Sequence, residues 1–374
     1  MSGRLEVLPR SARIALMHPR IESPSFFIGR GDDTDLISFG SGQPDLAPPP
    51  ATYKVLEHFR SFKYGRVQGE EALRTALSKE YPYAEPEDFV ITNGASEAID
   101  LALRAIAGRH PGGKVLLPRP YYYSYPHNVR LAGLVPVYTD LVDGKIDADA
   151  FMRDVEGCVA VLVNSPSNPT GTVQNIETLK RIEAYCEERG IYLISDEVYK
   201  DLIYVRENYL LHGEKVLTIN SFSKTYAMCG LRVGYLYTKD RDTVEAVVET
   251  KSHTSMNTSL VGQAMALAAM GERSSYVDRH VAIWRERRDR MYRGMLDLGL
   301  DLWEPEGAFY VLPHFKNPDR AMHDLYYHHR IITYNGEWFG AAHRLRFSYA
   351  LDVKKIDEGL RRVKKFLETE YQTY

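Results

Sequence analysis

Residues 159–199 read VAVLVNSPSNPTGTVQNIETLKRIEAYCEERGIYLISDEVY. The run 159–163 is continuously apolar, which is typical of a strand buried on both faces. Residues 176–189 have a helical pattern that Gly190 ends, and residues 191–194 form a second short apolar run. Two buried strands joined by a helix predict a parallel pair with a crossover connection, the repeating unit of α/β proteins.

The same alternation extends outward in both directions. A helix is expected over residues 96–107, with Ile99, Leu103 and Ile106 on one face. Further short apolar runs predict strands at residues 89–92, 114–117, 135–138, 216–220 and 233–237. We therefore expect an α/β protein whose large domain has three layers, αβα, around a mostly parallel sheet.

The pattern changes near residue 300. The elements expected around and beyond this point are helices at 243–251, 263–295 and 353–371 and strands at 307–312 and 344–349. They predict a second, smaller α+β domain. Since the chain ends of a two-domain enzyme often meet, residues 37–265 are assigned to the large domain. Residues 1–36 together with 266–374 are assigned to the small one.

The bulk composition is that of an ordinary globular protein. Of the 374 residues, 44% are hydrophobic and 26% charged, and a net charge of −3 leaves no basic surplus for nucleic acid. Cys158, Cys186 and Cys229 are widely spaced, which favours a reducing compartment over a disulfide framework or a zinc site. No apolar run approaches the roughly 18 residues that span a bilayer, and no signal peptide is recognisable. We expect a cytoplasmic protein without membrane or nucleic-acid partners.

Polar loops follow four of the predicted strands, and ligands of open α/β sheets bind beyond the carboxyl ends of strands. Residues 92–96, Thr-Asn-Gly-Ala-Ser, lead into a helix N-terminus, where N–H groups attract anions. A plain helix cap by Ser96 fits equally well.

Residues 164–171, NSPSNPTG, contain two X-Pro steps that stiffen the loop and can aim the Asn168 amide at a ligand. A simple tight turn is the alternative.

The other two loops contain Asp196 and Lys224. Asp196 ends an apolar strand, where a buried carboxylate needs a partner such as a protonated pyridine nitrogen. An N-cap for the following turn is the alternative.

Lys224 lies in SFSKTYAMCGLR, residues 221–232, and a lysine amine reacts with carbonyl groups by forming a Schiff base. The nearby Ser221, Ser223 and Arg232 suit a phosphate. Together they suggest a lysine bound to pyridoxal 5′-phosphate (PLP), whereas an isolated lysine is usually just solvated.

These segments resemble the class I and II aminotransferases, which are fold-type I PLP-dependent enzymes similar to aspartate aminotransferase. The similar pieces run from residues 40–45, GSGQPD, to residues 346–350, RFSYA, so the resemblance covers most of the chain. The motifs at 164–171, 195–199 and 221–232 occur in the order of that family with suitable spacing. The resemblance implies the PLP-dependent transferase fold type I, with PLP as the cofactor.

The resemblance also implies a role for each residue around the cofactor. Lys224 would hold PLP as the internal aldimine, and Asp196 would pair with the pyridine nitrogen. Tyr199 and Asn168 would hydrogen-bond the ring's phenolic oxygen and lower the pKa of the aldimine. Tyr122 would stack on the ring, although core packing is an alternative for the tyrosines at 121–125. The phosphate would be held by Ala95, Ser96, Ser221, Ser223 and Arg232.

Further residues resemble those that bind the substrate. Arg346 would grip the α-carboxylate with its planar fork, and Gly42 and Asn168 would lie beside the same group. Arg344, two residues earlier, should face the other side of its strand. Tyr64 resembles the tyrosine that reaches the phosphate of a partner subunit, which implies a homodimer with shared active sites.

The implied function belongs to amino acid metabolism: an amino group moves between an L-amino acid and a 2-oxo acid by a ping-pong mechanism. Lys224, Asp196 and Tyr199 would be the catalytic residues, with the Lys224 amine moving the α-proton. A β-lyase, a cyclase or an oxidase on the same scaffold would use the same residues. A PLP-sensing regulator would carry an added DNA-binding domain, for which a family region beginning by about residue 36 leaves no room.

The sequence does not name the substrate. Dicarboxylate-specific relatives use a second arginine, supplied by the partner subunit, for the distal carboxylate. The comparable stretch here, residues 251–257, reads KSHTSMN and has no arginine. Lys251 or His253 could substitute, or the stretch could simply end a helix at a subunit contact. A tyrosine-rich wall would tolerate aromatic or aliphatic side chains.

Overall fold

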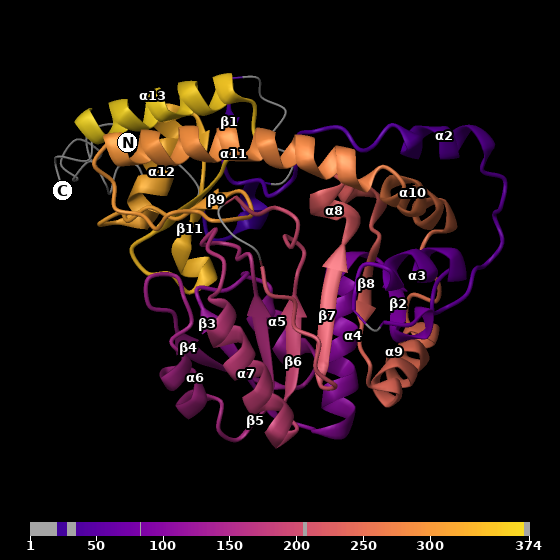
Figure 1. Cartoon of the computed structure of the whole chain (residues 1–374). Coiled ribbons are helices and arrows are strands. Elements are labelled where there is room, and N and C mark those ends of the chain that lie inside the picture. Colours follow the sequence, from indigo (N-terminus) through magenta and orange to yellow (C-terminus); the bar gives the residue numbers. More distant parts are fainter. Residues whose placement is uncertain (1–20, 28–34, 83, 205–207, 370–374) are drawn as a thin grey trace, which may run out of the picture.

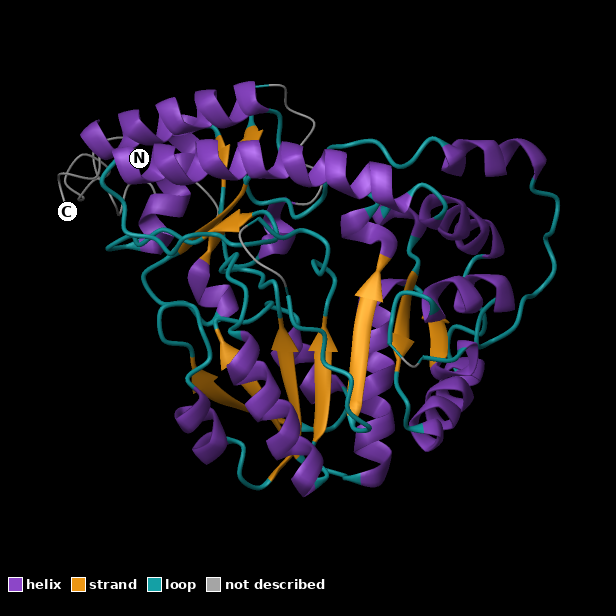
Figure 2. Cartoon of the chain, in the orientation of Figure 1, coloured by secondary structure: helices purple, strands orange, loops and turns teal. Residues whose placement is uncertain are grey.

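The computed structural model describes residues 21–27, 35–82, 84–204 and 208–369. A seven-stranded sheet lies at the centre of the larger part of the molecule, with helices around it (Figures 1 and 2). The strand order is β2-β8-β7-β6-β5-β3-β4, and β8 runs antiparallel to both of its neighbours while β7, β6, β5, β3 and β4 are parallel. The strands are β2 (Phe89–Thr92), β3 (Lys114–Arg119), β4 (Val135–Asp140), β5 (Cys158–Asn164), β6 (Tyr192–Asp196), β7 (Val216–Ser221) and β8 (Gly234–Tyr237).

Helices cover both faces of this sheet because both faces are apolar. Alternate residues of a strand point to opposite faces. Val161 and Val163 of β5 therefore pack with α6 (Ala148–Asp154) and α7 (Ile176–Arg189). Ala160 and Leu162 pack on the other face, which is covered by α4 (Gly94–Arg109), α5 (Tyr125–Leu131) and α9 (Arg241–His253). The predicted three-layer α/β architecture is confirmed.

A third apolar cluster closes the sheet at its β2 and β8 end. There Phe89 and Ile91 of β2 pack with Leu73 and Leu77 of α3 (Glu71–Ser78) and with Met265 of α10 (Leu260–Met270). The chain reaches this region through α2 (Ala51–His58), which lies at the periphery in Figure 1. Short helices complete this part of the chain: η3 (Pro86–Asp88), α8 (Phe222–Thr225) and η4 (Cys229–Leu231).

The C-terminal residues build a smaller sheet system above the carboxyl ends of the central strands (Figure 1). Three short antiparallel strands have the order β11-β12-β9, and β1 pairs in parallel with β10. The elements are η2 (Pro24–Phe27), β1 (Ile37–Ser38), α11 (Arg273–Asp297), β9 (Tyr310–Val311), α12 (Pro318–His329), β10 (Ile331–Ile332), β11 (Tyr334–Asn335), η5 (Gly336–Phe339), β12 (Leu345–Ser348) and α13 (Val353–Thr369). We propose that residues 266–369 form the small domain together with the described residues before 37, because Phe27 packs on Tyr326 and Tyr334 and Leu36 lies in the same apolar cluster. The pairing of β1 with β10 adds Ile37 and Ser38, which the expected boundary places in the large domain. Residues 1–20, 28–34 and 370–374 of the expected small domain lie outside the described residues.

Two predicted elements differ from the structure. The helix expected over 263–295 is divided: α10 ends at Met270 and α11 begins at Arg273, whose guanidinium pairs with Glu80 and Asp201. Gly271 stands at the break and disfavours a continuous helix. The strand expected over 307–312 is reduced to β9, because Ala308 has a positive φ of 54° that interrupts the extended backbone. Across the described part of the chain, no helix combines the length and apolarity that crossing a bilayer requires.

Candidate active site

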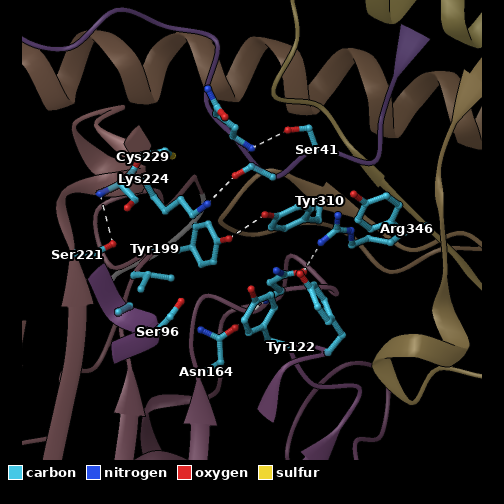
Figure 3. A pocket seen from close by; sticks show the side chains of 18 of the residues that line it. Ser41, Ser96, Tyr122, Asn164, Tyr199, Ser221, Lys224, Cys229, Tyr310 and Arg346 are labelled. Atoms are coloured by element: carbon cyan, nitrogen blue, oxygen red, sulfur yellow. Dashed lines mark hydrogen bonds between the residues drawn. The ribbon is translucent and has the colours of Figure 1, made fainter. Parts of the chain in front are cut away.

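A cavity of about 710 Å³ lies between the two parts of the molecule, at the carboxyl ends of β5, β6 and β7. Its volume is in the range of small-molecule sites. The central sheet contributes the loops that follow its strands, and the C-terminal part contributes Tyr310, Tyr334 and Arg346. Figure 3 shows Lys224, Tyr199, Tyr310 and Arg346 pointing toward one space.

Lys224 reaches into this cavity from the short helix α8, which begins where β7 ends. The Ser221 hydroxyl caps that helix by accepting the Ser223 N–H at 3.3 Å. The Lys224 ammonium donates a 2.6 Å hydrogen bond to the Gly42 carbonyl oxygen (Figure 3). Burial lowers the pKa of Lys224, and the nearby Arg346 adds to this effect. A lowered pKa increases the neutral fraction of the amine, which is the nucleophilic form.

Asp196 ends β6 and is almost fully buried. Its carboxylate accepts the Tyr125 hydroxyl at 2.6 Å and the Val198 N–H at 3.2 Å. Burial raises the pKa of Asp196 to about 6, and these two hydrogen bonds oppose the rise. Both donors are neutral, so a cationic ligand atom in the cavity would stabilise the ionised carboxylate.

The N-terminus of α4 and Arg232 form a cradle for an anion. Gly94 begins α4 with a φ of +77°, and a Cβ at this position would collide with the Arg232 guanidinium. Glycine therefore permits the guanidinium to lie against the helix N-terminus. Ala95 and Ser96 follow in the first turn, and Ser221 lies at the end of β7. Figure 3 shows Ser96 and Ser221 on the same side of the cavity. Backbone N–H groups, hydroxyls and a guanidinium are the donors that bind a phosphate.

Arg346 forms the opposite wall of the cavity. It projects from β12, is 2% exposed, and donates to the Asn168 Oδ1 at 2.9 Å and to the Gly40 carbonyl oxygen. Its guanidinium carbon lies 4.6–4.8 Å from the ring centroids of Tyr310, Tyr334 and Phe339. Its Nε is buried and has no hydrogen-bond partner within the described ranges. A buried cation whose two acceptors are neutral oxygens is a fitting site for a carboxylate.

Tyr199 and Tyr310 meet in the middle of the site. Their hydroxyl oxygens are 2.8 Å apart, and either one can be the donor. Burial raises the pKa of Tyr199 well above its usual value and the pKa of Tyr310 to about 12. Both phenols therefore keep their protons near neutral pH.

The structure brings nearly all of the predicted site residues together. The residues of that set that line the cavity are Gly42, Ala95, Ser96, Tyr122, Asn168, Asp196, Tyr199, Ser221, Ser223, Lys224, Arg232 and Arg346. Tyr64 does not line it, and its side chain is 83% exposed. The individual roles of all these residues stay predictions.

Other predicted residues lie away from the cavity. Arg344 pairs with Asp301 and stacks on Trp303, so it faces away from Arg346 as expected. Lys251 is fully buried and pairs with Glu97 at 2.8 Å. Lys251 therefore does not face the cavity of its own chain.

Sequence reasoning missed two functional candidates. Tyr125, whose hydroxyl bonds to Asp196, lies within the tyrosine cluster at 121–125, for which ring stacking and core packing are the two expectations. Tyr310 lies in a predicted strand whose apolar neighbours suggest a core position. The only local signal for either is a hydroxyl on a residue expected to be buried, because such a group needs a partner.

Comparisons with known proteins agree on one family. Residues 34–363 match the family Aminotransferase class I and II. The chain is 32% identical to the probable aspartate/prephenate aminotransferase of Aquifex aeolicus, over 91% of this chain and 93% of that protein.

Two solved structures are also similar. The aspartate aminotransferase of Thermotoga maritima gives a TM-score of 0.86 at 28% identity, over 99% of this chain and 100% of that one. The aromatic aminotransferase of Pyrococcus horikoshii gives 0.83 at 27% identity, over 92% and 99%. The expected fold type I and the enzymatic activity of an aminotransferase are confirmed. The chain belongs to the class I and II aminotransferases.

Proposed function

We propose that this aminotransferase uses PLP, held at Lys224, to move an amino group between an L-amino acid and a 2-oxo acid in two half-reactions. The observation that carries the proposal is the position of Lys224. Its amine lies in one cavity with a buried carboxylate, Asp196, a phosphate cradle at Gly94 and Arg232, and a carboxylate-binding arginine, Arg346.

The residues present fit this cofactor at both of its ends. Asp196 would pair with the protonated pyridine nitrogen, which supplies the positive charge that its buried carboxylate lacks. Gly94 leaves room for Arg232 beside the helix N-terminus, and together with Ser96 and Ser221 they would hold the phosphate. The Tyr199 hydroxyl would donate to the phenolic oxygen of the ring, with Asn168 beside it.

When bound, PLP supplies an electron sink that makes the α-proton of an amino acid acidic. The chain's own residues position the substrate and move that proton. Arg346 binds the α-carboxylate, which fixes the α-carbon in the cavity that Lys224 faces. The Lys224 Nζ accepts the proton from that carbon, and its lowered pKa favours the neutral amine that can do so.

We also propose a homodimer. Several aromatic and aliphatic side chains on α2 and the segment after it are exposed although they are large and apolar: Tyr53 (52%), Leu56 (54%), Phe62 (89%) and Tyr64 (83%). An exposed apolar patch of this kind is typical of a subunit contact. The exposure of Tyr64 is compatible with its reaching the phosphate of a partner.

A cytoplasmic location remains our proposal, and three free thiols favour it.

The cavity favours amino donors with uncharged, aromatic side chains. Among the described residues that line it, the cationic ones are Lys224, Arg232 and Arg346, and each already has a proposed role. Aromatic and aliphatic side chains make up much of the lining: Phe27, Ile99, Tyr122, Tyr123, Val198, Tyr310, Ile332 and Tyr334. A distal carboxylate would lose its water against this lining, and no unassigned cation among the described lining residues of this chain would compensate.

Half-reactions observed by absorbance test the proposal. An amino acid added to the PLP-loaded protein without any oxo acid should convert the bound cofactor to its amine form, and a 2-oxo acid should restore the first spectrum. Lys224→Ala should abolish both changes, whereas Lys180→Ala, at an exposed position on α7, should leave them intact. Normal amino transfer by Lys224→Ala would refute the role of the lysine. Release of ammonia or pyruvate without transfer would refute the two half-reactions.

A further inference from the structure

Tyr310 touches three groups of the site at once. It lies on β9, is 1% exposed, and its hydroxyl lies 2.8 Å from the Tyr199 hydroxyl (Figure 3). Its ring lies against the Arg346 guanidinium, 4.6 Å from centroid to carbon. Its hydroxyl also occupies the space that a side chain at Gly42 would need, and the Gly42 carbonyl is the acceptor for Lys224.

The number of protons determines the direction of the Tyr199–Tyr310 hydrogen bond. A phenol has a single O–H to donate and can accept through its lone pairs. Under the proposed function, Tyr199 donates its proton to the phenolic oxygen of the cofactor ring. The Tyr199 oxygen can then only accept from Tyr310, so Tyr310 becomes the donor of the pair.

We propose that Tyr310 is a positioning residue that donates a hydrogen bond to Tyr199 and thereby strengthens the hydrogen bond from Tyr199 to the ring oxygen. Hydrogen bonds in a chain polarise one another, so an O–H that also accepts a bond is a better donor. A stronger bond to the ring oxygen stabilises negative charge there. With the cofactor bound through Lys224, negative charge on the ring oxygen would be greatest after the linking nitrogen has lost its proton. Tyr310 would therefore lower the pKa of that nitrogen.

This inference rests on the proposed function, but it makes a separate claim about one hydroxyl. The substitution Tyr310→Phe removes that hydroxyl and keeps the ring against Arg346 and Tyr199. It leaves the other titratable groups of the cavity in place: Tyr122, Tyr123, Tyr125, Asp196, Tyr199, Lys224, Cys229, Arg232, Tyr334 and Arg346.

The test is a pH titration of the absorbance of the PLP-loaded protein without substrate. Tyr310→Phe should raise the apparent pKa of the bound cofactor by about half a unit, a roughly threefold change that corresponds to part of one hydrogen bond. Tyr334→Phe is the matched control, because it removes a hydroxyl from another ring that lies against Arg346, 4.8 Å away. It should leave this pKa at the wild-type value.

A double-mutant cycle with Tyr199→Phe shows whether the effect passes through Tyr199. If it does, adding Tyr310→Phe to Tyr199→Phe should produce no further shift. An unchanged pKa in the correctly folded single variant would overturn the inference. A shift that persists in full in the Tyr199→Phe background would overturn it as well. A wild-type protein without a Lys224-dependent cofactor spectrum would instead refute the proposed function.

Discussion

Asp196→Asn should stabilise the cofactor-free protein at alkaline pH. Burial raises the pKa of Asp196 from 3.8 to about 6, so the folded state binds this proton more tightly than the unfolded chain does. The stabilisation that this bound proton gives the folded state is therefore complete below 3.8, the pKa of Asp196 in the unfolded chain, and is lost as the pH rises through 6. A shift of about 2.2 units corresponds to roughly 3 kcal/mol in total. About 2 kcal/mol of this stabilisation is lost between pH 4.5 and 8.

Asparagine removes the charge but also one hydrogen bond. The Tyr125 hydroxyl and the Val198 N–H both donate to the Asp196 carboxylate, whereas an amide has a single oxygen to accept them. This loss costs about 1 kcal/mol, and it does so at every pH. The pH dependence of the difference between variant and wild type therefore isolates the effect of the buried charge.

Scanning calorimetry of the cofactor-free proteins at both pH values measures this difference. The advantage of Asp196→Asn over wild type should grow by roughly 4 °C in Tm between pH 4.5 and 8, at about 2 °C per kcal/mol for a chain of this size. Asp149→Asn, at a side chain that is 80% exposed, is the control and should show no such change. An equal advantage at both pH values would refute the reasoning. PLP should reverse the ranking, because wild-type Asp196 then gains a cationic partner.

Three further predictions concern the substrate half of the site. Gly42→Ala should lower kcat/KM about tenfold because its Cβ would collide with the Tyr310 hydroxyl. Adding Tyr310→Phe in the same chain should restore much of the lost kcat/KM, and an equal loss in the double variant would contradict this reasoning. Arg346→Lys should lower kcat/KM about 100-fold, mainly through KM, since lysine cannot form the fork that holds a carboxylate; an unchanged KM in steady-state assays would remove Arg346 from substrate binding. In a panel of amino donors, phenylalanine and tyrosine should exceed aspartate in kcat/KM by about tenfold or more, and a preference for aspartate would refute the uncharged pocket without affecting the aminotransferase assignment.

Most of the fold was predictable because its signals are local. The strand–helix–strand unit β5–α7–β6 has continuous apolar strands and a helix that ends at Gly190, which has the left-handed φ of 64°. The break between α10 and α11 was not predictable in this way. Gly271 is its one local mark, and an isolated glycine does not by itself end a helix. The pairing of Arg273 at the start of α11 with Glu80, 193 residues away in the chain, is a contact that the local pattern does not reveal.

The residues of the candidate site were likewise predictable only where their sequence signals are local. Lys224 and Asp196 could be predicted because each directly follows or ends an apolar strand within a recognisable motif. Tyr310 could not, because its partner Tyr199 lies 111 residues earlier and a tyrosine in a short strand has the same pattern as a core residue. Contacts between the two parts of the molecule are what the sequence pattern leaves undetermined.

The parallel pairing of β1 with β10 has a consequence for biosynthesis. Ile37 pairs with Ile331, so a segment translated early has no sheet partner until nearly 300 residues later. At about 5–20 residues per second, that interval is on the order of 15–60 s. The seven central strands are already translated by Tyr237, whereas β1, which ends four residues before Gly42, has no strand partner until β10 has been translated. On a translating ribosome, Gly42 and Lys224 are both made before β10 and Arg346, so the cavity is complete, and cofactor capture expected, only once the chain is almost finished.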